Sequence, residues 1–229
     1  MRRMIASSAR RLFRACLTIA SLAILAPGAA HSQPPHVPGA RTPDLVELVR
    51  LDSTFHLDIR YAGTNNFLHR AVYAQARAFL QRPAAEALAH AAKELRTRGY
   101  GIVVFDGYRP WSVTKEFWDA TPASQHTFVA DPQKGSKHNR GCAIDCSLYA
   151  LRSGAPVPMP STYDEFSEKA SPRYRGGSRT TRRMRDLLRG VMERNGFTVD
   201  RGEWWHFDYK DWAHYDVLDV PFDRIGQGR

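Results

Sequence analysis

The sequence predicts a single α+β domain. Segments with helical periodicity and short apolar segments follow one another without the regular strand–helix–strand alternation of a doubly wound sheet. The 229 residues include 43% hydrophobic and 24% charged side chains, which is typical of a globular protein. A chain of this length fits one compact domain. The composition excludes a collagen-like chain, a disordered acidic tail and a polytopic membrane protein.

Residues 1–32 have the three parts of a secretory signal peptide. Five arginines come first, an apolar run of 12 residues follows at 15–26, and small residues end the segment. That run is shorter than the ~20 residues that span a bilayer. The triplets Gly28–Ala30 and Ala30–Ser32 both fit a cleavage site, and an uncleaved N-terminal anchor is the alternative. We expect an exported protein, periplasmic or secreted, with no stable membrane insertion after cleavage.

The net charge of +10 does not indicate a nucleic-acid partner. Without the five arginines of residues 1–32, 28 basic residues stand against 23 acidic ones, a net charge of +5. A basic cluster at residues 169–183 lacks the interleaved aromatic residues on which bases stack. We expect that cluster to be a solvated loop and helix start.

A Pro-rich stretch at residues 33–43 predicts a tether, so we expect the folded domain over residues 44–229. Residues 44–61 contain extended-looking patches. Within them, apolar and polar side chains alternate at residues 55–61, which is typical of a strand.

Residues 83–98 have the pattern of an amphipathic helix. Pro83 suits the first helical position, and Gly99 follows the last turn. Apolar residues recur between them at helical spacing: Leu88, Ala91, Ala92 and Leu95. A buried strand at residues 100–105 and a turn at Asp106–Gly107 come next.

The second half of the domain mixes helices, strands and loops. A helix is expected from about Ser112, followed by loop-rich residues 119–141 and a strand at residues 143–149. Apolar residues at helical spacing predict a helix over residues 184–192, and residues 197–209 read as a closing strand region.

Two cysteines lie in the domain, Cys142 and Cys146. In an extended strand their Cα atoms would be ~13 Å apart, whereas a disulfide needs less than ~7 Å. We therefore expect two small buried thiols, and a bridge would require a local turn.

Two short segments hold the residues with the potential for chemistry. The first supplies His138 and Asp145, and the second supplies Glu203 and His206. A catalytic zinc ion takes three protein ligands, keeps one position for water and needs a carboxylate to accept the proton of that water. These four residues match that inventory, so the sequence predicts one zinc ion per chain.

Spacing constrains the local fold of this site. His138 and Asp145 are seven positions apart, and a straight strand would separate their Cα atoms by ~23 Å. Ligand atoms around one zinc ion lie within ~4 Å of one another. We expect the chain to fold back at residues 139–141 and continue as a strand, whose alternation points Asp145 away from both cysteines. Glu203 and His206 need a bend between them if they lie on a strand.

Arg109 follows the predicted strand at residues 100–105 and is a candidate for stabilising an oxyanion, which needs positive charge or hydrogen-bond donors. From the pattern alone, other interpretations remain open. Arg109 would also suit a structural salt bridge, and His138 or His206 taken singly would suit an ordinary hydrogen-bonded histidine.

The sequence resembles a known metallopeptidase family. Ser-x-His-x-x-Gly-x-Ala-x-Asp at residues 136–145 and Glu-Trp-Trp-His at residues 203–206 are similar to motifs of zinc D-alanyl-D-alanine dipeptidases of the VanX type. That family is grouped with D,D-carboxypeptidases and hedgehog-like domains. The resemblance extends over about residues 44–221, and three further stretches match: Arg60–Ala62 with Asn66–Phe67, Asp106–Pro110 and Pro158–Asp164.

This resemblance implies a role for each residue of the predicted site. His138, Asp145 and His206 match the zinc ligands. Glu203 matches the catalytic base, and Arg109 matches the arginine that stabilises the transition state.

The resemblance also implies substrate contacts and a fold. Asp164, Tyr61 and Ser136 fall where the family contacts the dipeptide, and Asp164 would pair with the free amino terminus. A central, mainly antiparallel sheet flanked by helices and a small closed pocket are expected. The two cysteines are not part of the family motif, and the segment between Arg109 and His138 looks shorter than in the vancomycin-resistance enzymes.

We expect zinc-dependent hydrolysis of D-alanyl-D-alanine to two D-alanines in cell-wall peptide turnover. A D,D-carboxypeptidase that trims peptidoglycan peptides is an alternative, but a carboxylate at Asp164 favours a free amino terminus over an acylated one. A non-catalytic zinc or cell-wall binding module is a second alternative, but such a module needs no spare base at Glu203.

Overall fold

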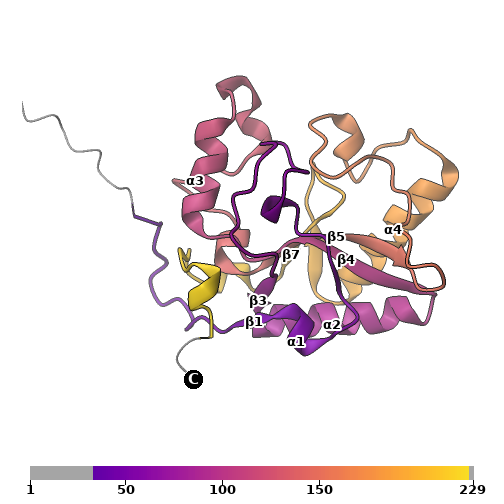
Figure 1. The fold of residues 1–229 in the computed structure, drawn as a ribbon, viewed down its shortest axis with the longest axis horizontal. Coiled ribbons are helices and arrows are strands. Elements are labelled where there is room, and N and C mark those ends of the chain that lie inside the picture. Colours follow the sequence, from indigo (N-terminus) through magenta and orange to yellow (C-terminus); the bar gives the residue numbers. More distant parts are fainter. Residues whose placement is uncertain (1–32, 227–229) are drawn as a thin grey trace, which may run out of the picture. The chain divides into compact units, whose positions relative to one another are not determined.

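The computed structural model describes residues 33–226 (Figure 1). The signal peptide predicted for residues 1–32 lies outside the described residues. The folded unit begins at Pro34. Within the described part of the chain, no helix is both long enough and apolar enough to cross a bilayer.

The central sheet has five strands in the order β2-β4-β5-β7-β6. β2 pairs with β4 in parallel, and the other neighbours pair antiparallel. A second, two-stranded antiparallel sheet joins β1 and β3. The α+β class and the mainly antiparallel sheet are therefore confirmed. The strand bounds are β1 Leu45–Glu47, β2 His56–Leu57, β3 Phe79–Gln81, β4 Tyr100–Asp106, β5 Ala143–Ala150, β6 Phe197–Val199 and β7 His206–Tyr209.

Two long helices cover the sheet. α2 and α4 pack against each other, α2 also packs on β4, and α4 packs on β5 and β6. Figure 1 shows α3 on the side of the strands away from α2. The α-helices are α1 Leu48–Leu51, α2 Arg82–Arg96, α3 Trp111–Ala120 and α4 Arg179–Arg194. The short 3₁₀ helices are η1 Arg60–Ala62, η2 Ala123–Phe128, η3 His138–Arg140, η4 Glu168–Ala170, η5 Trp212–His214 and η6 Phe222–Arg224.

The predicted helices are present because their apolar stripes face the core. α2 has Pro83 in its first turn and buries the predicted stripe, and Gly99 follows it with φ +86°. α4 is longer than the predicted 184–192 segment because Ser178 caps it, accepting a hydrogen bond from the backbone N–H of Thr181.

Two predicted strand regions are shorter than expected. Only His56–Leu57 of residues 55–61 is paired, and η1 follows. The Asn66 side-chain amide donates to three backbone carbonyls around this turn and holds it closed, so the strand cannot continue. The region at residues 197–209 divides into β6 and β7 because a turn at residues 201–205 reverses the chain.

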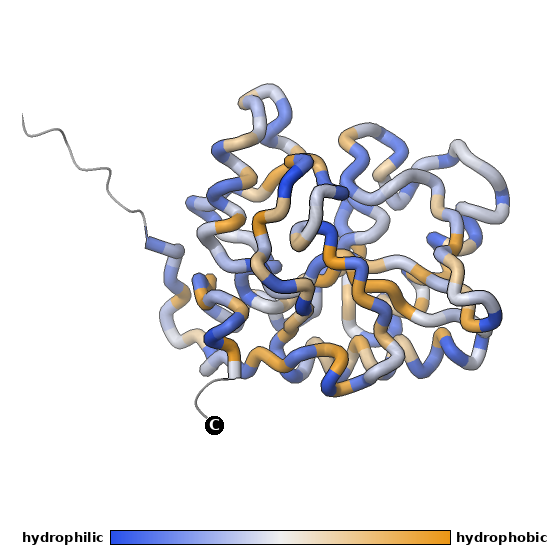
Figure 2. Tube along the Cα trace, in the orientation of Figure 1, coloured by the Kyte–Doolittle hydropathy of each residue, from blue (hydrophilic) through white to orange (hydrophobic). Residues whose placement is uncertain are grey.

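The hydrophobic core contains side chains of the sheet and of helices α2 and α4. Its fully buried members include Leu88, Ile102, Ile144, Leu188 and Phe207. In Figure 2 the hydrophobic positions recur along the strands and along α2. Polar residues alternate with core residues along β5 and β7, so their side chains lie on the other face of the sheet.

Cys142 and Cys146 are free thiols that are both 0% exposed. Burial raises the pKa of Cys142 to about 12, so this thiol stays protonated at neutral pH. The prediction of two small buried thiols is confirmed, and neither belongs to the polar cluster described next.

Candidate active site

Three side chains converge where β5 pairs with β7. Asp145 in β5 lies directly opposite His206, the first residue of β7. His138 lies in η3, and Gly141 follows in the left-handed conformation with φ 65°. A residue without a Cβ adopts this conformation at little cost, so the chain turns here and enters β5. The predicted fold-back between His138 and Asp145 is confirmed.

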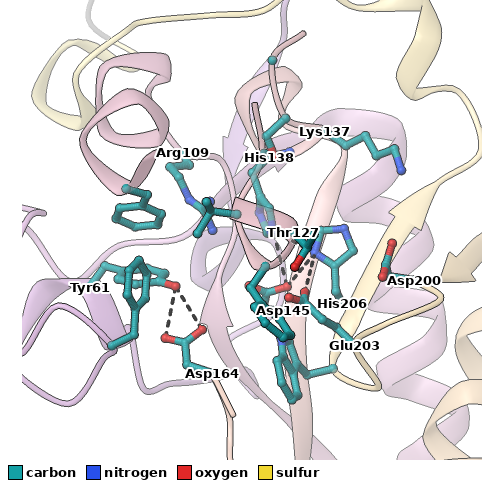
Figure 3. Close-up of a pocket in the computed structure, with 18 of the residues that line it drawn as sticks. Tyr61, Arg109, Thr127, Lys137, His138, Asp145, Asp164, Asp200, Glu203 and His206 are labelled. Carbon is teal, nitrogen blue, oxygen red and sulfur yellow. Dashed lines mark hydrogen bonds and ion pairs between the residues drawn. The ribbon is translucent and has the colours of Figure 1, made fainter. Parts of the chain in front are cut away.

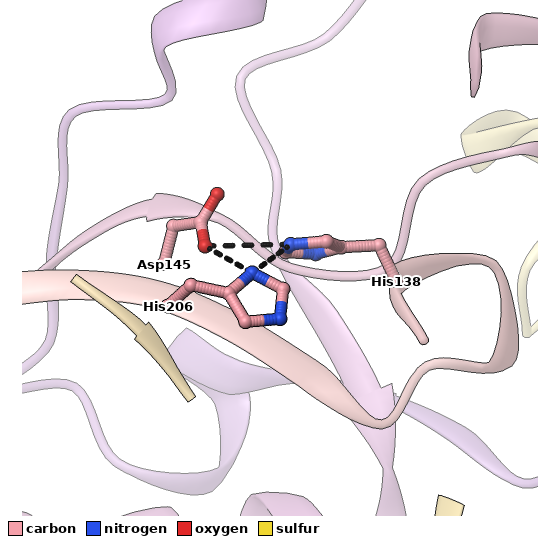
Figure 4. A group of neighbouring side chains, drawn as sticks. All are labelled: His138, Asp145 and His206. Atoms are coloured by element: carbon pink, nitrogen blue, oxygen red, sulfur yellow. Dashed lines mark hydrogen bonds and ion pairs between the residues drawn. The ribbon is translucent and has the colours of Figure 1, made fainter. Parts of the chain in front are cut away.

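The ligand atoms of these three residues form a compact triangle (Figure 4). His138 Nε2 lies 3.1 Å from His206 Nδ1 and 3.3 Å from Asp145 Oδ1, and His206 Nδ1 lies 3.0 Å from the same oxygen. A tetrahedral zinc ion at its usual bond lengths would separate its ligand atoms by about 3.3 Å. Two ring nitrogens and one carboxylate oxygen at these distances fit zinc.

Hydrogen bonds orient each of the three side chains. His138 Nδ1 lies 2.7 Å from the Gly107 carbonyl oxygen and donates to it, which leaves Nε2 free to bind a metal. His206 Nε2 lies 2.9 Å from Asp208 Oδ1, which leaves Nδ1 free in the same way. The Tyr163 hydroxyl donates to Asp145 Oδ2 at 2.9 Å. Such partners fix ring orientation and tautomer in metal sites.

The electrostatics of the cluster favour a cation. Burial opposes the charge on Asp145, but the neighbouring His138 and His206 outweigh burial and hold the pKa of Asp145 below its usual range. Burial also opposes the charge on His206, but hydrogen bonds to Asp145 and Asp208 outweigh it and raise the pKa of His206. The cluster therefore holds a carboxylate and attracts positive charge.

Glu203 lies beside the triangle and is not one of its corners. Its Oε2 is 3.9 Å from His206 Nδ1, and 31% of its side chain is exposed, facing the cavity. The turn at residues 204–205 supplies the bend that the sequence requires between Glu203 and His206. Burial of the carboxyl group, with the negative charge of Asp145, raises the pKa of Glu203 to about 8. A pKa this close to neutral lets a carboxyl group both accept and donate a proton, which suits proton transfer.

Arg109 forms a salt bridge and also lines the cavity. Its Nη2 and Nε donate to Asp106 Oδ2 at 2.7 and 3.0 Å, and the Tyr73 hydroxyl donates to the other oxygen of Asp106 at 2.9 Å. The guanidinium lies over the ring of Phe117, 4.6 Å from its centroid. The structural salt bridge is therefore present, and it holds the guanidinium at the cavity wall; the role of Arg109 in stabilising an oxyanion stays a prediction.

The remaining three predicted residues lie in the same cavity. The Tyr61 hydroxyl donates to Asp164 at 3.1 Å (Figure 3), and burial raises the pKa of Asp164 to about 7. Ser136 Oγ accepts a hydrogen bond from the backbone N–H of His138 at 3.2 Å. The cavity has a volume of about 410 Å³, and all eight predicted site residues line it.

Comparison with known proteins identifies the family. A family profile described as D-ala-D-ala dipeptidase matches residues 41–223 of this chain. The chain belongs to the D-Ala-D-Ala dipeptidase family. The matched range contains the whole cavity lining, so the resemblance noted in the sequence motifs is confirmed.

Three relatives named D-alanyl-D-alanine dipeptidase match this chain over most of its length. The Escherichia coli (strain K12) protein is 33% identical, with 79% of this chain and 92% of that protein covered. The Enterococcus faecium protein is 34% identical, with 67% of this chain and 85% of that protein covered. The Enterococcus faecalis (strain ATCC 700802 / V583) protein is 32% identical, covering 75% and 92%.

Sequence reasoning missed three groups of this dipeptidase-family site: Gly107, Tyr163 and Asp208. Asp208 had a usable signal, because residues two apart on a strand share a face and His206 was already a predicted ligand. Gly107 and Tyr163 lie in two of the stretches that match the family, but neither spacing nor residue type gave them a role. Each meets its histidine or aspartate through a contact between distant parts of the chain.

Proposed function

We propose that this protein is a zinc-dependent dipeptidase that hydrolyses D-alanyl-D-alanine to two D-alanines. The observation that carries this proposal is the triangle of His138, Asp145 and His206 beside Glu203, which is not a ligand, in one cavity. When bound, zinc supplies Lewis-acid chemistry, which polarises a carbonyl group and lowers the pKa of water.

Glu203 acts as the general base and then as the general acid. Its carboxylate takes the proton of the attacking water and passes it to the leaving amine. The position of Glu203 next to His206, without direct ligation, keeps the carboxylate available for this transfer. A non-catalytic binding module has no use for such a group.

Arg109 stabilises the oxyanion that forms when water adds to the peptide carbonyl. A charge-assisted donor is most effective when its direction is set before the reaction. The two hydrogen bonds to Asp106 Oδ2 and the packing on Phe117 set that direction here.

Asp164 and Tyr61 bind the amino end of the substrate. A free ammonium group beside the Asp164 carboxyl forms an ion pair in a largely buried place, where an uncharged amide would leave the carboxylate without a countercharge. This difference favours a free dipeptide over the acylated peptides that a carboxypeptidase trims. Ser136 lines the cavity next to His138 and completes the substrate contacts.

The exported location is part of the proposal. Residues 1–32 have the composition of a signal peptide. In the periplasm or outside the cell, the enzyme would salvage or trim D-Ala-D-Ala derived from peptidoglycan. Fractionation of cells that express the full chain tests this, and activity confined to the cytosol would overturn it.

Metal analysis combined with a cleavage assay tests the activity. We expect one zinc ion per chain, cleavage of D-Ala-D-Ala and little or no cleavage of N-acetyl-D-Ala-D-Ala. Equal turnover of both substrates would refute the dipeptidase assignment and favour the carboxypeptidase. Bound zinc with no turnover of either substrate would favour a binding module.

A further inference from the structure

An exposed phenylalanine stacks across the cavity rim. Phe128 is 40% exposed and ends η2, whereas Phe166 lies in the loop that also carries Asp164. Their ring centroids are 4.8 Å apart and their planes differ by 9°. Both residues line the cavity, so the stack joins two separate segments at its edge.

The stack is the outer end of a ladder of aromatic rings. Phe166 contacts Phe67 with centroids 5.4 Å apart, and Phe67 contacts Phe117 at 5.2 Å. Phe117 then contacts Tyr61 at 4.6 Å, and Tyr61 donates to Asp164. The ladder therefore runs from the surface to the pair of residues that receives the amino end of the substrate.

The chain is held in place both before and after Phe128. His126 stacks on Trp118 with centroids 3.7 Å apart, and its Nε2 lies 2.9 Å from the Thr121 carbonyl oxygen. On the other side, the Trp111 indole donates to the Pro132 carbonyl at 2.9 Å. These contacts anchor the chain before and after Phe128, so the position of its ring against Phe166 is fixed.

We propose that the Phe128–Phe166 stack determines substrate length by closing the cavity beyond Asp164. This inference rests on the proposed dipeptidase function. A substrate with one more residue at its amino end must extend past Asp164 toward the cavity rim, where Phe166, two residues along the same loop, stacks on Phe128. A free dipeptide ends at Asp164 and avoids them. Exposure of a large apolar ring at this rim is explained by that barrier.

The test compares a dipeptide with a tripeptide that also has a free amino terminus. We would measure kcat/KM for D-Ala-D-Ala and for tri-D-alanine with the wild type, Phe128→Ala and Phe166→Ala. The ratio of tripeptide to dipeptide kcat/KM should rise about tenfold or more in each variant, as expected when a steric barrier of side-chain size is removed. Leu151→Ala is the control, because Leu151 is 42% exposed and does not line the cavity; its ratio should match the wild type.

The outcomes separate this inference from the function on which it rests. If the wild type cleaves the dipeptide and neither variant gains activity on the tripeptide, the length barrier is wrong and the dipeptidase function stands. If the wild type cleaves no dipeptide, the proposed function fails and the inference fails with it. Phe166→Leu, which keeps an apolar side chain but removes the ring, replaces Phe166→Ala if that variant does not fold.

Discussion

Glu203 and His206 illustrate how two neighbouring side chains take different roles. His206 Nδ1 faces the other two corners of the triangle, while Glu203 Oε2 lies 3.9 Å from that nitrogen. The distance of each side chain from the other ligand atoms therefore distinguishes His206, a ligand, from Glu203, a base. This separation leads to a direct prediction for Glu203.

Glu203→Gln should bind zinc normally and lose activity. The amide keeps the size of the side chain but cannot accept the proton, so kcat should fall ~10²-fold or more. Zinc content per chain and kcat should be measured on the same preparation. Unchanged turnover would show that Glu203 is not the base, and lost zinc would show that it is a ligand.

Asp208→Asn should weaken zinc binding without removing a ligand. Asp208 accepts from His206 Nε2 at 2.9 Å and pairs with Lys137 Nζ at 2.6 Å, so it sets the ring orientation. Loss of such a partner typically costs 10–100-fold in metal affinity. Competition with a zinc chelator measures the affinity. Asp223→Asn is the control because Asp223 is exposed and does not line the cavity, and an equal loss there would contradict the role of Asp208.

At the scale of elements, the link between η3 and β5 brings the site together. Gly141 has φ 65°, and a Cβ there would lie 2.5 Å from Leu45 Cδ2 and 3.3 Å from the Gln81 backbone nitrogen. Strain and crowding both act against any larger residue. Because His138 precedes this turn and Asp145 follows it, a shift here would also disturb the ligand triangle.

Gly141→Ala should lower the free energy of unfolding by about 1–3 kcal/mol. Gly154→Ala is a matched control, because Gly154 has φ +72° but a Cβ there meets nothing within 4 Å. The control should therefore show the cost of the backbone conformation without the crowding. Urea denaturation measures both variants. Equal destabilisation would mean that contact with Leu45 and Gln81 adds nothing.

Local patterns predicted the elements, and long-range contacts placed them. The α2 stripe and the turn before β5 are encoded within a few residues, so spacing alone located them. The irregular pairing of β4 and β5, which shifts register between Val104 and Asp106, and the alignment of Asp145 with His206 depend on strand order. No local pattern encodes strand order. The family resemblance implied a mainly antiparallel sheet and the roles of the site residues, which spacing alone did not give.

At the scale of the whole molecule, burial of ionisable groups links stability to pH. Burial raises the pKa of Asp164 to about 7, with further effects from the charges of Asp145, Arg109 and Asp106 and the Tyr61 hydroxyl. In the unfolded chain the carboxyl group titrates near 3.8. The folded state therefore binds the proton more tightly, and stability falls as pH rises from about 4 to 7.

Asp164→Asn should remove this component of the pH dependence. An amide stays neutral, so the stability of the wild type relative to the variant should fall as pH rises, by no more than about 4 kcal/mol. Both proteins should be measured by urea denaturation in the presence of a chelator, since a bound metal would alter the charges around Asp164. Parallel stability curves from pH 4 to 8 would contradict the raised pKa.

Zinc should stabilise the entire fold, because its three ligands come from η3, β5 and β7. His138 and His206 are 68 positions apart in the sequence. Only folding brings them together, so zinc binds the folded state preferentially. At about 100 times the dissociation constant, zinc should add about 2.7 kcal/mol, or a rise of about 5–10 °C in Tm for a domain of this size. His206→Ala should lose most of this rise, whereas His214→Ala, which replaces an exposed histidine outside the cavity lining, should keep it. Thermal unfolding with and without zinc decides the matter, and an equal rise in all three proteins would place the ion elsewhere.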